Sequence, residues 1–223
     1  MDVAAAMAAQ GARHGTVIGA DTQTAGRGRR GASWSSPPGA GLYVSVITRP
    51  AASQIPLLTL AAGVGVRDGV AAATGLAADL KWPNDLIVGA RKLAGILAEG
   101  ISIGTPAQAV VIGVGINVQP AAYPPEVAAR ATSLEGELGR PVDVQALLSR
   151  VLSTLWLRLA QLDDDPSAIL QAWRAASPNA RGTRVEWDDR EGVTAGIDDT
   201  GALIVDTPAG AERVIAGELR WHL

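Results

Sequence analysis

The stretch DTQTAGRGRRGASW, residues 21–34, carries the strongest chemical signal in the sequence. Three arginines and three glycines fall within its residues 26–31, and the apolar run 16–20 before it predicts a short strand. Glycine lets a backbone bend and approach a ligand closely, and arginine offers a planar, permanently charged donor for phosphate or carboxylate. The stretch therefore predicts a cationic loop that folds over an anionic ligand.

Other interpretations of this loop fit less well. GRGRRG matches the dinucleotide pattern G-x-G-x-x-G, but that motif needs a helix at its last glycines. The residues that follow, ASWSSPPG at 32–39, cannot form one. No Gly-Lys-Ser/Thr follows either, which excludes a P-loop. A nucleic-acid surface is disfavoured by the short cluster and the net charge of −3. A solvated loop without a ligand remains open on this stretch alone.

Composition limits the chemistry that the chain can perform. Its 223 residues suit one large domain, or a large and a small one. There is no cysteine, so disulfides and thiolate chemistry are excluded. The two histidines, His14 and His222, lie near opposite ends of the chain without sequence partners for a triad or a metal site. Catalysis is therefore expected from Lys, Arg, Asp, Asn and backbone groups. The sequence shows no signal peptide and no membrane-length apolar run, so we expect a cytoplasmic protein.

Periodicity divides the chain into a large mixed part and a small β part. Helices are expected at 4–10, from 53 or 54 to 73, at 142–162 and at 166–176, and strands at 16–20, 42–48, 78–82, 86–88, 93–98 and 109–118. The composition changes at 177–182. Short alternating segments at 183–187, 193–197, 202–205 and 213–216 then predict a separate all-β module.

A second chemical cluster joins KWPND, residues 81–85, to RKLAGIL, residues 91–97. The chain has 17 arginines and only two lysines, and both lysines, Lys81 and Lys92, belong to this cluster. Its turn presents Asn84 and Asp85, which could orient a phosphate-bearing substrate or bind magnesium. Lys92 on the returning strand can reach an anionic oxygen there. A hairpin with ordinary surface ion pairs is the alternative.

Taken in order, GRGRRG…W, KWPND, RKLAGIL and GVGINV resemble the motifs of the biotin protein ligases. The resemblance covers the chain from Thr16 to the C-terminal β module. It implies an α+β fold related to class II aminoacyl-tRNA synthetases and lipoate ligases, with a mixed sheet, helices and a small C-terminal β-barrel. We expect a catalytic domain at 1–177 and the barrel at 178–223. The absence of a helix-turn-helix segment suggests the enzyme-only type, with no DNA binding, as a monomer or homodimer.

The resemblance also implies an activity and a set of site residues. Biotin is activated by ATP to biotinyl-5'-AMP and then transferred to a lysine of a biotin carboxyl carrier domain. Lys92, Arg27 and Arg29 would be catalytic. Biotin would contact Gln23, Gly26, Arg27, Gly28, Arg29, Lys92 and Gly95. The nucleotide would contact Arg29, Arg30, Trp34, Asn84, Asp85 and Asn117, with Mg²⁺ at Asp85.

Two departures from the family pattern bear on this hypothesis. Ala32 stands where members often carry a further arginine, so the loop has one cation fewer and is expected to retain the adenylate less well. The Ser/Thr-Thr-Asn motif that holds the ureido ring is missing before the first helix, so the sequence starts late or is truncated. Two alternatives therefore stay open: a lipoate or octanoate ligase or acyltransferase of the same fold, and an inactive ligand-binding homologue.

Overall fold

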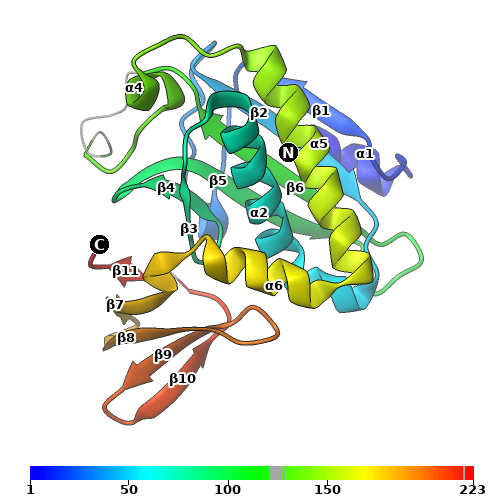
Figure 1. The fold of residues 1–223 in the computed structure, drawn as a ribbon. Helices are drawn as coiled ribbons and strands as arrows, with labels where there is room; N and C mark the ends of the chain where they lie inside the picture. The colour runs from blue at the N-terminus through cyan, green and yellow to red at the C-terminus, as the bar shows by residue number, and fades with distance from the viewer. Residues whose placement is uncertain (121–126, 128, 218) are drawn as a thin grey trace.

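The computed structural model describes residues 1–120, 127, 129–217 and 219–223 (Figure 1). Its larger sheet has the order β1-β2-β6-β5-β4-β3, and every pairing between these strands is antiparallel. An isolated parallel bridge pairs Lys92 of β5 with Ala131. The strands are β1 (Val17–Ala20), β2 (Gly41–Thr48), β3 (Asp79–Lys81), β4 (Asp85–Val88), β5 (Arg91–Ile101) and β6 (Ala109–Asn117).

Helices cover this sheet unequally. In Figure 1, α2 and α5 run side by side across one face, and α6 crosses below them. Asp143 caps the start of α5 by accepting hydrogen bonds from the Gln145 and Ala146 amides, and the left-handed Gly75 ends α2. The helices are α1 (Asp2–Ala9), α2 (Ile55–Thr74), α4 (Leu134–Leu138), α5 (Val144–Asp164) and α6 (Pro166–Ala175), with 3₁₀ turns η1 (Arg29–Gly31), η2 (Ala52–Gln54) and η3 (Pro178–Ala180).

The two faces of β6 meet different environments, because side chains alternate along a strand. Val110, Ile112, Val114 and Ile116 join the large core under α2 and α5, whereas Ala109 and Val111 pack against α1. The next two positions on the α1 face are Gly113 and Gly115. Side chains are thus missing from the middle of the sheet on that face.

Close packing of α2 on α5 depends on small residues. A Cβ at Gly65 would lie 2.7 Å from the Leu155 Cα, and one at Gly69 would lie 2.5 Å from the Val151 Cα. Of the described helices, the segment Ala52–Thr74, with mean hydropathy 1.3, is long and apolar enough to cross a membrane. That segment is mostly buried inside the protein, and its apolar face belongs to the core.

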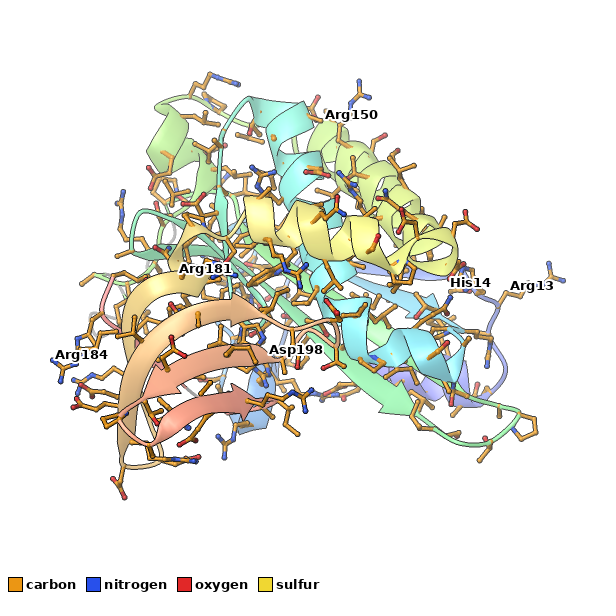
Figure 2. All side chains as sticks on the ribbon, turned by 60° about the horizontal axis from the view of Figure 1, so that its bottom comes forward. Arg13, His14, Arg150, Arg181, Arg184 and Asp198 are labelled. Atoms are coloured by element: carbon orange, nitrogen blue, oxygen red, sulfur yellow. The ribbon has the colours of Figure 1, made fainter. Side chains whose placement is uncertain are left out.

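The C-terminal part forms a five-stranded antiparallel sheet of order β10-β9-β8-β7-β11. It contacts the larger part directly: the Trp82 indole N–H donates to the Gly201 carbonyl at 3.0 Å. Asp198, labelled in Figure 2, begins the loop that contains Gly201 and accepts hydrogen bonds from Thr200 and Arg213. The strands are β7 (Arg181–Trp187), β8 (Arg190–Ile197), β9 (Leu203–Thr207), β10 (Gly210–Val214) and β11 (Arg220–Trp221).

The expected fold class is confirmed, and the expected helices and strands are present with shifted ends. The β4–β5 hairpin turns at Gly89-Ala90, because Arg91 already pairs with Val88. Strand β8 begins three residues earlier than expected, after a two-residue turn. Strand β11 was not expected, because its two residues are too few to show alternation.

Candidate functional site

A cavity of about 700 Å³ lies on the α1 face of the larger sheet, under the stretch 21–36, here called the Arg/Gly loop. Its base is a glycine floor made of Gly95, Gly113 and Gly115. Gly95 on β5 pairs with Gly115 on β6. A Cβ at Gly115 would lie 2.8 Å from the Trp34 indole, and one at Gly95 would lie 3.1 Å from it. The floor therefore admits flat groups close to the backbone.

The Arg/Gly loop is an ordered hairpin rather than the start of a helix. The Trp34 amide donates to the Gly26 carbonyl at 2.9 Å, and the Ser36 hydroxyl donates to Gln23 Oε1 at 2.6 Å. Gly26 has no room for a side chain, since a Cβ there would lie 2.4 Å from the Trp34 carbonyl oxygen. The tip is the turn η1, where Arg30 has a φ of 54°. This geometry agrees with the rejection of a dinucleotide fingerprint.

The three arginines of the loop have different surroundings. Arg27 is held by the carboxylates of Glu99 and Asp2. Arg29 has no ion pair among the described residues and lines the cavity. Burial lowers the pKa of the Arg29 guanidinium, while Asp85 acts in the opposite direction. Arg30 lines both this cavity and the neighbouring cleft. Arg29 is therefore a partly desolvated cation that faces the cavity.

Lys81, Asp85 and Lys92 form a second charged group beside the floor. Lys92 Nζ lies 2.6 Å from Asp85 Oδ1, and Lys81 Nζ lies 3.6 Å from Asp85 Oδ2. The Asp85 side chain is only 14% exposed, so the pair of ammonium groups stabilises a nearly buried carboxylate. Lys92 Nζ also lies 5.3 Å from the centroid of the Trp34 ring. Lys81 and Lys92, which the sequence placed in one cluster, thus both contact the Asp85 carboxylate.

The two expected asparagines hold the backbone at this edge. Asn84 Nδ2 donates to the Ile96 carbonyl at 2.7 Å, which ties the turn before β4 to β5. Asn117 is buried and donates to the carbonyls of Thr132 at 3.0 Å and Lys92 at 3.4 Å. The Thr132 amide also donates a hydrogen bond to the Lys92 carbonyl, at 2.9 Å. Asn117 therefore fixes the strand position from which Lys92 projects.

Asp85 does not fit a protein-held magnesium site. Among the described residues there is no group of three or more Asp, Glu, His or Cys side chains placed to hold a metal. Asp85 is already neutralised by the two lysines, and magnesium usually needs carboxylates together with substrate phosphates. We therefore assign no step to a metal at Asp85.

A larger cleft of about 1670 Å³ opens beside the cavity, between the two sheets. Lys81, Asp85 and Lys92 line it from one side, and the β7–β8 turn with Asp188 and Asp189 lines it from the other. Neither histidine belongs to the lining of the cleft or the cavity. Figure 2 shows His14 at the opposite end of the molecule from the C-terminal sheet. Lys92 therefore borders the cleft as well as the cavity.

Sequence reasoning missed several residues that line the cavity, among them Met1, Asp2 and Tyr43. Met1 covers the floor, since its Sδ would clash with a Cβ at Gly113. It also missed Glu99, the partner of Arg27. One signal was present in the sequence: the alternate glycines of VIGVGIN leave one face of a strand bare, which predicts a hollow instead of a fully covered strand.

The fold and the cavity together define an α+β protein with a cation-lined cavity whose chemistry suits a small ligand with anionic groups. Residues 5–117 match the Biotin/lipoate A/B protein ligase family, and residues 186–219 match the Biotin protein ligase C terminal domain. The chain belongs to this family.

Similar proteins cover nearly the whole chain. The Biotin--[acetyl-CoA-carboxylase] ligase of Mycobacterium tuberculosis is 38% identical over 228 residues, covering 96% of this chain and 82% of that protein. The bifunctional ligase/repressor BirA of Bacillus subtilis is 33% identical and is covered to 68% of its length. The solved structure of the Aquifex aeolicus biotin protein ligase in complex with biotin and ATP superposes with a TM-score of 0.83 at 26% identity, covering 97% of this chain and 93% of that one.

Proposed function

We propose that the chain is an ATP-dependent biotin protein ligase. The observation that carries the proposal is the glycine-floored cavity with Arg29 and Lys92 beside it. Two anions, a carboxylate and a triphosphate, must meet in such a reaction, and fixed cations lower the repulsion between them. The membership of the family, together with its C-terminal domain, favours biotin over lipoate or octanoate as the acid.

In the first step, a biotin carboxylate oxygen attacks the α-phosphorus of ATP. The bond between the α-phosphorus and the bridging oxygen breaks, and pyrophosphate leaves with its electron pair. Lys92 would neutralise the carboxylate and the α-phosphate, because its ammonium is a compact charge that can serve two oxygens. Arg29, already partly desolvated, would bind phosphate oxygens at little further desolvation cost. Gln23, Gly26, Gly28 and Gly95 would surround biotin.

Trp34 supports a place for the adenine beside the floor. Its indole N–H is buried and has no hydrogen-bond partner among the described residues. An unpaired buried donor costs about 1–3 kcal/mol, so a ligand acceptor at this position would gain that energy. Trp34 and Arg30 would contact the nucleotide, whereas Asn84 and Asn117 would support it through the backbone bonds described above.

In the second step, the neutral amine of an acceptor lysine attacks the carbonyl carbon of biotinyl-5'-AMP. An amide bond forms, AMP leaves, and one proton is released. We propose a biotin carboxyl carrier domain as the acceptor, with the cleft between the sheets as its approach to Lys92. We further propose that residues 1–177 form the catalytic unit and 178–223 the second domain, and that ATP brings any magnesium on its own phosphates in the cytoplasm.

Biotin-dependent exchange between ATP and labelled pyrophosphate tests the first step on this chain. Exchange with biotin but not with lipoate or octanoate is the expected result. Exchange with lipoate alone would replace the proposal by the lipoate alternative. Absence of exchange with all three acids, in a sample whose fold is verified by circular dichroism, would favour the inactive ligand-binding homologue.

A further inference from the structure

Arg27 makes the most extensive ion pair of the Arg/Gly loop. Its Nε donates to Glu99 Oε1 at 2.9 Å and its Nη2 donates to Glu99 Oε2 at 2.8 Å, while Nη1 donates to Asp2. The Glu99 side chain is 29% exposed and the Asp2 side chain 72% exposed. The parallel pair of bonds from one guanidinium to one carboxylate is the strong, directional form of this contact.

The charges of this cluster argue against a further anion at Arg27. One guanidinium faces two carboxylates, so the group carries a net charge of −1 before any substrate arrives. Glu99 and Asp2 raise the pKa of Arg27 above its usual value, which shows how firmly its charge is already satisfied. A biotin carboxylate placed against this side chain would meet repulsion from Glu99 and Asp2. Arg29 carries no such pair among the described residues.

The position of Arg27 shows what the ion pair can do instead. Arg27 lies at the base of the hairpin, where it bridges to Ser33, and Glu99 lies on β5, four residues beyond the floor glycine Gly95. The Arg27–Glu99 bonds therefore join the base of the loop to the strand that also carries Lys92. Without them, the loop that holds Arg29 would lose its ion-paired anchor on the sheet.

We propose that Glu99 is a positioning residue of the biotin ligase: through its paired bonds to Arg27, it holds the Arg/Gly loop closed over the glycine floor. The inference rests on the proposed function and assigns Arg27 to anchoring rather than to direct recognition of the biotin carboxylate. Loss of Glu99 lowers the fraction of molecules with a closed loop. The apparent affinity for biotin falls in proportion to the closed fraction, because only the closed form binds biotin well.

The experiment compares three variants with the unsubstituted protein. Glu99→Gln removes the charge of the anchor, and Glu99→Asp keeps the charge. Asp68→Asn is the matched control, because Asp68 also accepts two hydrogen bonds from one arginine, Arg158, but joins α2 to α5. Each is measured by the rate of trypsin cleavage at the loop arginines and by KM and kcat for biotin in pyrophosphate exchange.

For Glu99→Gln we expect loop cleavage about tenfold faster and a biotin KM about tenfold higher, the scale of one lost charge-assisted pair. The kcat at saturating biotin should change by less than about twofold, since bound biotin restores the closed form. Glu99→Asp should recover part of both effects. Asp68→Asn should change neither the loop cleavage nor the biotin KM.

A lower biotin KM in Glu99→Gln would overturn the proposal, because freeing Arg27 would then have improved direct recognition of biotin. Unchanged cleavage at the loop arginines would overturn it as well. The cleavage rates need no substrate, so they test the anchor even if the chain shows no exchange. Failure of the anchor and failure of the ligase function are therefore separate results.

Discussion

Replacing glycine by alanine should change the free energy of unfolding in opposite directions at two positions of α2, because only one of the two packs closely on α5. Replacing glycine by alanine inside a helix normally stabilises it by about 1 kcal/mol. At Gly63 the new Cβ would lie 3.4 Å from a Leu80 methyl group, an ordinary contact. At Gly69 it would lie 2.5 Å from the Val151 Cα and 2.9 Å from the Val151 amide nitrogen. Those backbone atoms can move only if α5 moves.

The expected difference between the two variants follows from these contacts. Gly63→Ala should raise the free energy of unfolding by about 0.5–1 kcal/mol. Gly69→Ala should lower it by about 1 kcal/mol, because an overpacking cost of about 2 kcal/mol exceeds the helix gain of about 1 kcal/mol. A gap of about 2 kcal/mol corresponds to roughly 4–8 °C in Tm for a chain of this size. Thermal unfolding followed by circular dichroism measures it, with Gly63→Ala as the control for the gain in helix propensity. Equal melting temperatures would show that the helices are not held as closely as the structure indicates.

Three further predictions concern the site and the C-terminal sheet. Lys92→Ala should reduce biotin-dependent pyrophosphate exchange about 1000-fold by removing the charge at the reacting oxygens, whereas Lys81→Ala, whose Nζ lies 3.6 Å rather than 2.6 Å from Asp85, should cost about tenfold; similar losses would contradict the division of roles. Asn117→Ala should lower the stability in urea by about 1–3 kcal/mol, since the hydrogen bonds from its buried amide to the Thr132 and Lys92 carbonyls are lost; an unchanged midpoint would count against it. Burial would raise the pKa of Asp198, but hydrogen bonds from Thr200 and Arg213 outweigh it and lower the pKa to about 2. This folded value lies below the unfolded one, so Asp198 should contribute about 2 kcal/mol above roughly pH 4 and lose it as the pH falls towards 2. The stability gap to Asp198→Asn should close over that range, and a constant gap would refute the assignment.

Much of the fold could be predicted because its signals are local. The core helix α5 shows its apolar period and its Asp143 cap in the sequence itself, and the strand at 109–117 is a nearly continuous apolar run. The strand β11 could not be predicted, because its two residues become a strand only by pairing with β7, across 33 intervening residues or more.

The site residues also fall into those that local motifs reveal and those that only the tertiary structure reveals. The arginines, lysines and glycines around the cavity are recognisable because the family motifs keep them close together in the sequence. Glu99 is 72 positions from Arg27, and nothing in its own neighbourhood marks it as a partner. Met1 and Asp2 reach the cavity only because α1 lies across the sheet beside the floor. Contacts between distant elements are therefore what the sequence could not supply.

Arg27 and Arg29 show why contacts between distant elements matter for function. Only Gly28 separates them, both are charged, and sequence reasoning assigns both to catalysis. Tertiary structure distinguishes them, because Glu99 and Asp2 neutralise one while burial leaves the other partly desolvated and facing the cavity. Within this loop, the arginine that is already paired with two carboxylates is placed to organise the loop, and the arginine without an ion pair among the described residues is placed to bind the substrate. Which arginine of a cationic loop anchors the loop and which can bind a substrate therefore depends on the carboxylates that the fold places beside each one.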